Sequence, residues 1–213
     1  PSAAEATTAL ATVEIEEGFK IELIASEPLI GDPVDMEIDE YGRLYVVEMP
    51  GYPLDKSGSG KVMLVSDRDS DGTMDKSTVY AENLVLPNSV MRWKNGLLVT
   101  DAPNVLYFED RDGDGHADLR DTLLTGFALS NPQHNLNSPL LGIDNWIYLA
   151  HEGAVSTEAY ANEFGDTGEE IRYPGKESSP RLPKTANGRA VRFRPDKGKL
   201  EILSTHKQLG HTF

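Results

Sequence analysis

A strand followed by an aspartate-rich turn occurs twice in this 213-residue sequence, and the repeat restricts the fold more than any other feature. Residues 62–75 (VMLVSDRDSDGTMD) match residues 105–118 (VLYFEDRDGDGHAD) at an offset of 43. Looser repeats of apolar residues, a polar turn and a strand occupy 36–46, 90–99 and 141–149. Hairpin-like repeats with a period of roughly 40 to 50 residues are typical of β-propeller blades. The sequence therefore predicts an all-β fold.

On that period, the chain holds the N-terminal part of a propeller, with about four blades. Apolar or alternating runs between turn residues predict strands, including 19–25, 43–48 and 96–100. Six side chains are expected in buried layers: Ile38, Leu44, Val46, Leu98, Ile147 and Leu149. A fresh strand pattern begins at Ala190. We expect that this chain alone does not close the ring, and that the remaining blades or another chain complete it.

The chain is expected to divide into a flexible arm, 1–14, and a partial propeller, 15–213. An insertion interrupts the propeller at about 152–183. It begins with a short helix predicted around 157–164 and continues with a stretch rich in Gly, Pro and Ser. Such an insertion is usually a surface loop over one face of the ring.

Composition excludes several classes of function. The chain has no cysteine, which rules out disulfides, cysteine zinc sites, a thiol nucleophile and covalently attached haem c within it. Its net charge of −15 argues against nucleic acid or an anionic membrane as partner and favours a cation or a metal. No apolar run is long enough for a membrane span, and residues 1–10 do not resemble a signal peptide. We expect a processed chain that is periplasmic or extracellular.

The two aspartate-rich turns are candidate calcium loops. Carboxylates at positions 1, 3, 5 and 9, Gly at position 6 and a backbone carbonyl at position 7 provide a shell of oxygen ligands. The predicted ligands are Asp67, Asp69, Asp71, Thr73 and Asp75 in the first loop, and Asp110, Asp112, Asp114, His116 and Asp118 in the second, with Thr73 and His116 contributing carbonyls.

These loops differ from a helical EF-hand. Position 12, where an EF-hand places a bidentate Glu, holds Thr78 in the first loop and Asp121, a further candidate ligand, in the second. Strand-like residues precede both loops, so they are similar to the β-hairpin calcium loops of integrin-type propellers. The alternative is a pair of solvated acidic turns without metal, in which the carboxylates would repel one another.

A second candidate site lies in 131–153. His134 precedes a strand-turn-strand unit, where propeller loops line the central face, and an imidazole suits proton abstraction from an alcohol. Glu152 follows the returning strand and is expected to approach His134 and fix its tautomer. Asn135 or Asn137 is expected beside the imidazole. The alternative is that His134 only caps a turn and that His151 and Glu152 only pack a loop.

Several motifs together resemble the propeller part of the PVC-type haem-binding proteins, a family of membrane-bound dehydrogenases. The resemblance extends from about Ile15 and rests on these segments: 31–49, the two aspartate-rich loops, 133–137 (QHNLN) and 188–196 (GRAVRFRPD). In that family the propeller is followed by helical repeats and a cytochrome c domain. The resemblance thus implies a cytochrome c partner domain, with haem c on a part of the protein that is absent here.

The family is distantly similar to soluble quinoprotein glucose and sorbosone dehydrogenases. Their pattern of a catalytic His, a turn and a Tyr-containing strand aligns with His134, 142–145 and Tyr148. The resemblance implies that His134 is the base for hydride abstraction and that pyrroloquinoline quinone is a further cofactor. The orienting Asp of those enzymes falls at Gly153, next to Glu152. With Asn135 and Asn137, Arg189 and His211 are candidates for the quinone-binding face.

Two functions remain open from the sequence. The first is a calcium-binding propeller module of a periplasmic or secreted dehydrogenase that oxidises a sugar or alcohol and is linked to quinone or haem. The second is a calcium-stabilised propeller without catalysis, which binds glycan or protein partners in an extracellular assembly.

Overall fold

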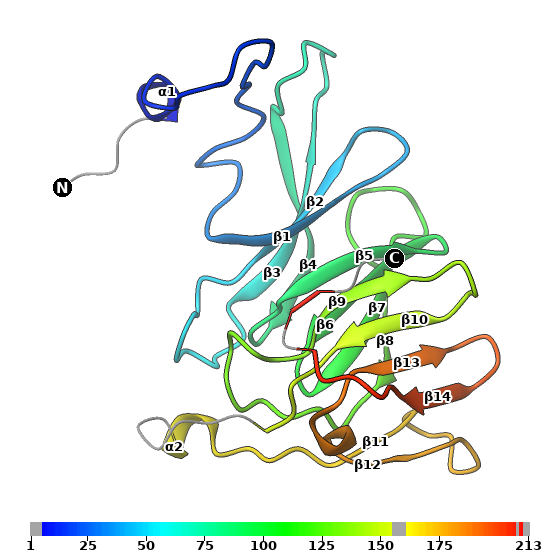
Figure 1. The fold of residues 1–213 in the computed structure, drawn as a ribbon. Helices are drawn as coiled ribbons and strands as arrows, with labels where there is room; N and C mark the ends of the chain where they lie inside the picture. Colours follow the sequence, from blue (N-terminus) through cyan, green and yellow to red (C-terminus); the bar gives the residue numbers. More distant parts are fainter. Residues whose placement is uncertain (1–5, 155–160, 208, 211–213) are drawn as a thin grey trace.

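Three four-stranded antiparallel sheets make up most of the molecule (Figure 1). The computed structural model describes residues 6–154, 161–207 and 209–210. Blade 1 contains β1 (Pro33–Ile38), β2 (Leu44–Glu48), β3 (Gly60–Ser66) and β4 (Lys76–Leu84). Blade 2 contains β5 (Ser89–Trp93), β6 (Gly96–Asp101), β7 (Asn104–Glu109) and β8 (Leu119–Leu124). Blade 3 contains β9 (Asn137–Leu141), β10 (Ile147–Ala150), β13 (Val191–Arg194) and β14 (Lys199–Ile202).

Each sheet is a meander in which consecutive strands pair, except that the insertion separates β10 from β13. The first strands of successive blades contact one another, β1 with β5 and β5 with β9. The blades therefore fan out from a common inner edge, as in a propeller. The prediction of blade-like sheets that do not close a ring is confirmed for the described residues. They form three four-stranded sheets and one two-stranded sheet, β11 (Glu170–Ile171) with β12 (Leu182–Lys184), where about four blades were expected.

Apolar side chains from alternate positions of the strands fill the junctions between blades. At the junction of blades 1 and 2, residues such as Tyr45 and Leu64 pack against Val90, Val99 and Phe108. A second cluster joins blade 2 to blade 3. Five of the six side chains expected in buried layers are indeed buried: Leu44, Val46, Leu98, Ile147 and Leu149.

The prediction for Ile38 is wrong, because this side chain is 57% exposed. Ile38 ends β1 on the face of blade 1 that points away from blade 2, and no sheet among the described residues covers that face. Alternation along a strand indicates which residues share a face. It does not show whether another sheet packs on that face.

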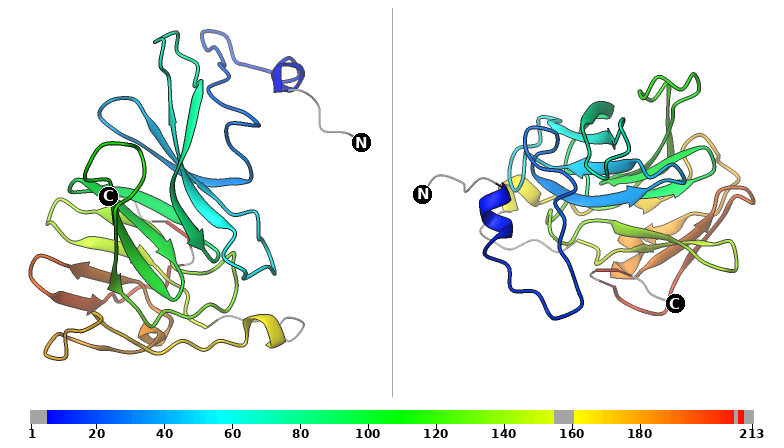
Figure 2. Two further views of the ribbon diagram at one scale, coloured as in Figure 1. Left: turned by 180° about the vertical axis from the view of Figure 1, so that it is seen from behind. Right: turned by 90° about the horizontal axis from the view of Figure 1, so that it is seen from above.

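The prediction of a strand at 19–25 is also wrong, because these residues pair with no strand in the described structure. One tertiary hydrogen bond holds the segment: the amide of Met74 donates to the carbonyl of Ile24 at 3.0 Å. Figure 2 shows the N-terminal stretch running along the side of blade 1 that faces away from the other blades. It begins with a short helix, α1 (Ala6–Leu10).

The insertion does more than cover the surface. Ile171, Tyr173 and Leu182, in and around the β11–β12 pair, are buried in the same cluster as blades 2 and 3. The helix expected around 157–164 is present at α2 (Ala161–Phe164), while 157–160 lie outside the described residues. A 3₁₀ turn, η2 (Thr185–Gly188), leads back to β13. None of the described helices is long and apolar enough to cross a membrane.

Candidate metal loops and the central face

Both aspartate-rich segments are hairpin loops that join the third and fourth strands of a blade. The first connects β3 to β4 and the second connects β7 to β8. In each loop, three carboxylates offer one oxygen each, and these oxygens lie within 4.8 Å of one another. The two groups are Asp67, Asp69 and Asp71, and Asp110, Asp112 and Asp118. Carboxylate oxygens are the donors that calcium prefers, so the residues present fit this ion.

The two loops repeat the same internal hydrogen bonds. Asp67 accepts from the backbone amides three and five positions later at 2.6 and 2.8 Å. Asp110 accepts from its equivalents at 2.7 and 2.9 Å. Asp71 accepts from the amide of Thr73, and Asp114 from that of His116, at 2.7 and 2.8 Å. The repeat in sequence is therefore also a repeat in backbone geometry.

The backbone of the first loop favours the ionised form of the Asp67 carboxyl. The amide of Gly72, which donates to Asp67, is the main cause that lowers the pKa of that carboxyl below its ordinary value. Both loops turn through left-handed residues, at Ser70 (φ 63°) and Gly113 (φ 81°), which are again 43 positions apart. Asp67 thus stays ionised at neutral pH and available to a cation.

The two clusters share positions 1 and 3 of the loops and differ in the third carboxylate, which is Asp71 at position 5 in the first loop and Asp118 at position 9 in the second. Asp75 and Asp118 accept from the amides of Arg68 and Arg111 at 3.2 and 2.8 Å, which ties the two ends of each loop together. Asp121 lies on β8, opposite Tyr107, and is not a member of the second group of carboxylates.

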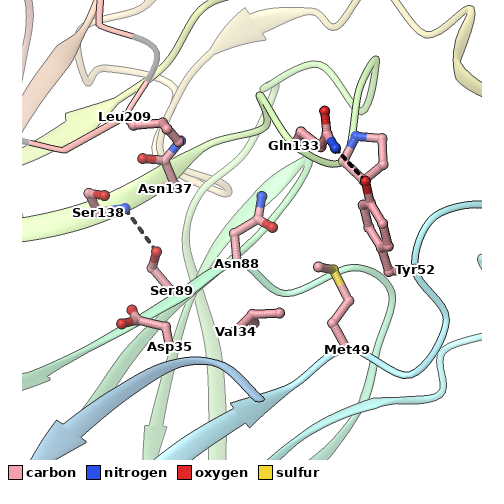
Figure 3. A pocket seen from close by; sticks show the side chains of 11 residues that line it. Val34, Asp35, Met49, Tyr52, Asn88, Ser89, Gln133, Asn137, Ser138 and Leu209 are labelled. Atoms are coloured by element: carbon pink, nitrogen blue, oxygen red, sulfur yellow. Dashed lines mark hydrogen bonds between the residues drawn. The ribbon is translucent and has the colours of Figure 1, made fainter. Parts of the chain in front are cut away.

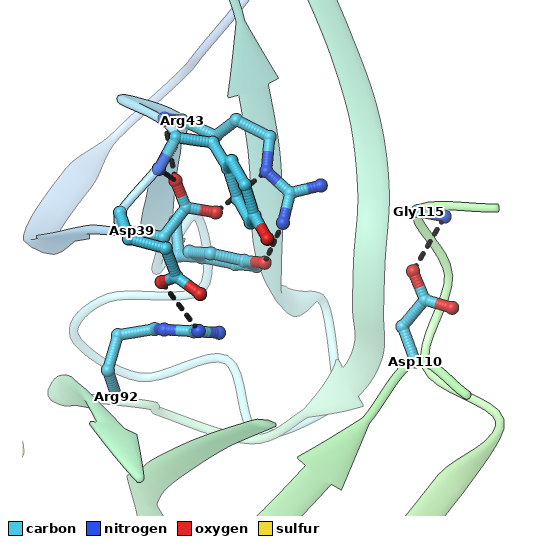
Figure 4. A network of polar contacts seen from close by, with 8 residues as sticks. Asp39, Arg43, Arg92, Asp110 and Gly115 are labelled. Carbon is cyan, nitrogen blue, oxygen red and sulfur yellow. Dashed lines mark hydrogen bonds and ion pairs between the residues drawn. The ribbon is translucent and has the colours of Figure 1, made fainter. Parts of the chain in front are cut away.

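The second loop also packs against blade 1. The amide of Asp110 donates to the hydroxyl of Tyr80 at 3.2 Å, and the amide of Ala117 donates to the carbonyl of Tyr80 at 2.9 Å. Figure 4 shows Asp110 and Gly115 beside the polar network of blade 1 in which Arg43 bonds Asp39. The second loop is therefore part of the junction between blades 1 and 2.

His134 and Glu152 form a close pair at blade 3. His134 lies in the turn before β9, where its amide donates to the carbonyl of Asn131 at 2.9 Å, and Glu152 follows β10. Nδ1 of His134 is 2.6 Å from Oε2 of Glu152. The two side chains are 24% and 31% exposed, so both remain reachable from solvent. The expected approach of Glu152 to His134 is present in the structure, and the catalytic role of the pair stays a prediction.

The end of the second strand carries a buried titratable residue in every blade. Glu48 of blade 1 accepts from the amide of Gly31 at 2.7 Å. Asp101 of blade 2 accepts from the amides of Val85 and Leu86, the latter at 2.9 Å. These carboxylates hold the loop that enters the innermost strand of their own blade. Glu152 contacts the corresponding loop of blade 3 through the side chain of His134.

In blade 3 the corresponding position holds His151. The same register position of the second strand holds Leu44 in blade 1, Leu97 in blade 2 and Ile147 in blade 3. In each blade the titratable residue follows four positions later. His151 is fully buried, its ring stands edge-on to Phe127, and burial lowers its pKa to about 4. Burial likewise raises the pKa of Asp101, although its hydrogen bonds oppose that shift.

The predicted quinone-face residues do not all come together. Asn135 is 1% exposed, and its side chain makes no hydrogen bond to the described residues. Asn137 donates to the carbonyl of Asn135 at 2.7 Å and lines a central pocket. Arg189 is exposed directly after η2, and His211 lies outside the described residues.

The central pocket has a volume of about 510 Å³ and lies where the three innermost strands meet (Figure 3). Polar side chains from each blade reach it: Asp35 from β1, Ser89 from β5, and Asn137 with Ser138 from β9. The amide of Ser138 donates to the hydroxyl of Ser89 at 3.0 Å, and the amide of Val90 donates to Asp35 at 2.9 Å. Burial raises the pKa of Asp35.

Asp35 and Ser89 were not among the candidates from sequence, because neither belongs to a motif with a recognisable spacing. The signal that was available is their shared position at the start of an innermost strand, one in each of two repeats. That position becomes informative only once the blades are aligned. Gln133, next to His134, also lines the pocket and donates to the hydroxyl of Tyr52.

Over residues 5–213 the chain matches a domain of unknown function, DUF7133, and it belongs to that family. Comparison with curated proteins finds no match. No solved structure matches either.

Proposed function

We propose that this DUF7133 chain is a calcium-binding propeller module, with one ion in each aspartate-rich loop. The observation that carries the proposal is that both loops, at an offset of 43 residues, hold a cluster of three carboxylates and make the same amide hydrogen bonds. Three carboxylates held within a few ångströms repel one another, and a divalent cation relieves that repulsion. Because the second loop touches Tyr80 of blade 1, a bound ion there also stabilises the junction between blades.

Calcium titration by calorimetry tests this proposal. The wild-type chain is expected to bind two ions and to gain thermal stability, because a ligand that binds only the folded state stabilises it by mass action. Asp67→Asn and Asp110→Asn each remove a central ligand, and each variant should bind one ion. Asp121→Asn, an exposed carboxylate outside both clusters, is the control and should still bind two. Absence of saturable binding at millimolar calcium contradicts the proposal.

We further propose that the module belongs to a periplasmic or secreted dehydrogenase for a sugar or alcohol, with His134 as base and Glu152 as its orienting partner. The support is the 2.6 Å contact of Glu152 with Nδ1 of His134, a geometry in which a carboxylate orients an imidazole for proton abstraction. The resemblance to PVC-type haem-binding proteins and quinoprotein dehydrogenases points the same way. Pyrroloquinoline quinone or haem, when bound, would supply the electron acceptor. Haem c would be carried by another part of the protein, since this chain has no cysteine.

Dye-linked oxidation of a panel of sugars and alcohols by the quinone-supplemented natural protein tests the catalytic role. His134→Gln should lower turnover by roughly 10² to 10⁴ without changing the fold. Glu152→Gln should lower turnover and shift its pH profile, because the imidazole loses its orienting charge. His206→Gln, an exposed histidine that contacts the carbonyl of Gly188, is the control. Unchanged turnover in His134→Gln contradicts the catalytic proposal and leaves the calcium proposal standing.

A non-catalytic module that binds glycan or protein partners is the second candidate. It is favoured by Glu48 and Asp101, which occupy nearly the same blade position as Glu152 and hold backbone amides of a loop. On this alternative, Glu152 fixes the loop of blade 3 through His134. Glu152→Gln would then lower stability, and no substrate in the panel would be oxidised. Further partners that we propose are remaining propeller blades and a cytochrome c domain.

A further inference from the structure

The two ends of the central pocket differ in chemistry (Figure 3). At one end lie oxygen-bearing side chains from all three blades: Asp35, Ser89, Asn137 and Ser138. At the other end lie the side chain of Met49 and the exposed ring of Tyr52. The volume of about 510 Å³ is in the range of sites for small organic molecules. The pocket therefore fits a ligand with a polar head and an apolar or aromatic body.

Asp35 gives the polar end a negative charge that has no counter-charge beside it. Among the described residues that line the pocket there is no lysine, arginine or histidine. The hydrogen bonds to Asp35 come from neutral donors, the amides of Val90 and Met36, each at 2.9 Å. Charged groups inside a protein are usually paired with an opposite charge. The described part of the chain does not supply one for Asp35.

The neutral donors offset only part of the cost of burying this carboxylate. Burial raises the pKa of Asp35, and the hydrogen bonds from Val90, Met36 and Ser89 oppose that shift without cancelling it. An ionised carboxylate accepts about four hydrogen bonds on its two oxygens, so Asp35 has room for a further donor. A positively charged donor would provide a hydrogen bond and the opposite charge together.

The groups around Asp35 offer further oxygen atoms to such a donor. The hydroxyl oxygen of Ser89 accepts from the amide of Ser138 at 3.0 Å and lies next to Asp35 in the pocket. Asn88 points into the middle of the pocket, and its side-chain amide makes no hydrogen bond to the described residues. An ammonium group carries three N–H donors and no acceptor. It therefore matches an end of the pocket that presents carboxylate, hydroxyl and amide oxygens.

A metal ion matches the pocket less well. Calcium takes roughly six to eight oxygen ligands, often several of them carboxylates, and Asp35 belongs to neither of the two carboxylate clusters. The side chains of Met49 and Tyr52 offer nothing to a bare ion of this kind. The ring of Tyr52 can contact the body of an organic ligand and attract its positive charge. Both ends of the pocket are used only if the cation is organic.

We propose that the central pocket binds a small organic ammonium compound, with its ammonium group on Asp35 and Ser89 and its apolar or aromatic body against Met49 and Tyr52. The net charge of −15 favours the approach of such a cation. Because β1, β5 and β9 each contribute a side chain, the site exists where the three blades meet. It requires neither calcium in the aspartate-rich loops nor a redox cofactor, so it is independent of the functions proposed above.

NMR of the methionine methyl groups in the wild-type chain tests the proposal, with benzylammonium chloride as the probe and benzyl alcohol as its neutral counterpart. Met49 lines the pocket, whereas Met36 and Met74 lie on the face of blade 1 that points away from blade 2. We expect benzylammonium to shift the Met49 signal saturably while the Met36 and Met74 signals stay in place. Benzyl alcohol should bind roughly tenfold more weakly, because it cannot form an ion pair with Asp35.

Two matched variants test the role of the charge. Asp35→Asn should weaken the binding of benzylammonium roughly tenfold and leave that of benzyl alcohol unchanged. Glu37→Gln is the control, because it removes the same charge from the same face of β1 but does not line the pocket. Its affinity for benzylammonium should stay within about threefold of wild type. The comparison of amine and alcohol needs no substitution, so it decides the matter even if Asp35→Asn does not fold.

Several results would overturn the proposal. Equal affinity for benzylammonium and benzyl alcohol would show that the pocket recognises only the ring. A shift of the Met49 signal by potassium chloride that blocks the effect of benzylammonium would overturn it in favour of a monovalent metal ion. Shifts confined to Met36 and Met74 would place the binding on the outer face of blade 1. The absence of a saturable Met49 shift at roughly 20 mM benzylammonium would also overturn it.

Discussion

In each blade, the residue at the end of the second strand determines how the loop that enters the first strand is held. Glu48 and Asp101 hold backbone amides there, and His151 stands at the same place in blade 3 without a carboxylate. In blade 3 the buried imidazole of His151 packs edge-on against Phe127, and the carboxylate lies one residue later, at Glu152. Blade 3 therefore differs from the others at the residue level in a way that changes its response to pH.

His151 is expected to make the fold acid-sensitive. Its folded-state pKa of about 4 lies below the ordinary 6.5, so the unfolded chain binds a proton that the folded chain does not. The stability that neutral His151 allows is present above pH 6.5 and is lost as the pH falls toward 4. Linkage gives a loss of about 2 kcal/mol between pH 7 and pH 5. Urea unfolding at the two pH values should show a smaller loss in His151→Gln than in wild type, whereas His206→Gln should match wild type.

At the scale of elements, the second strand and the loop that enters the first strand act as a unit in each blade. Asp101 at the end of β6 receives the amides of Val85 and Leu86, and these residues lead into β5. Leu86 is fully buried, so the loop carries both a polar and an apolar anchor. The position of the innermost strand, and with it the central pocket, depends on this contact.

Asp101→Ala should destabilise the chain by about 2–4 kcal/mol, because two backbone amides lose their acceptor inside the protein. Asp101→Asn keeps one acceptor oxygen and removes the buried charge, so its destabilisation should stay within about 1 kcal/mol. Denaturant titration of the two variants measures the difference. Equal loss in both would show that the charge, and not the acceptor, fixes the loop.

Much of the element structure could be predicted from the sequence, because strands, turns and the aspartate-rich loops are set by local patterns. The proximity of Glu152 to His134 followed from a strand that returns beside its neighbour. The misassignments have one physical cause: Ile38 and segment 19–25 depend on a covering sheet that local alternation does not describe. Asp35 and Ser89 were missed because a pocket between innermost strands becomes visible only when three blades are assembled.

The whole molecule is a three-blade section with one polar face and one apolar face. The outer face of blade 3 carries the ion pairs of Arg192, whereas the outer face of blade 1 exposes the apolar side chains of Met36 and Ile38. Met36 pairs with Val46 as Val90 pairs with Val99, so these two residues occupy the same repeat position. That position is exposed in blade 1 and buried in blade 2. Two substitutions of the same kind should have very different effects.

In the 213-residue chain, Val90→Asp should destabilise the fold by about 3 kcal/mol or more, because it places an unpaired carboxylate in the junction of blades 1 and 2. Met36→Asp, at the equivalent exposed position, should change stability by no more than about 0.5 kcal/mol. Thermal or urea unfolding of both variants compares them directly. Similar losses would show that the side chain of Met36 is packed against other residues of this chain.

The meander order of the sheets also has a consequence for synthesis on the ribosome. Blade 1 is drawn from residues 33–84 and blade 2 from 89–124, so each sheet pairs only strands that emerge close together in time. At roughly 5–20 residues per second, either blade is available within about ten seconds, and blade 2 can condense on a finished blade 1. Blade 3 can form only after the insertion has been synthesised, because the insertion separates β10 from β13. During synthesis, the edge of β10 is therefore the strand edge that waits longest for its partner, β13.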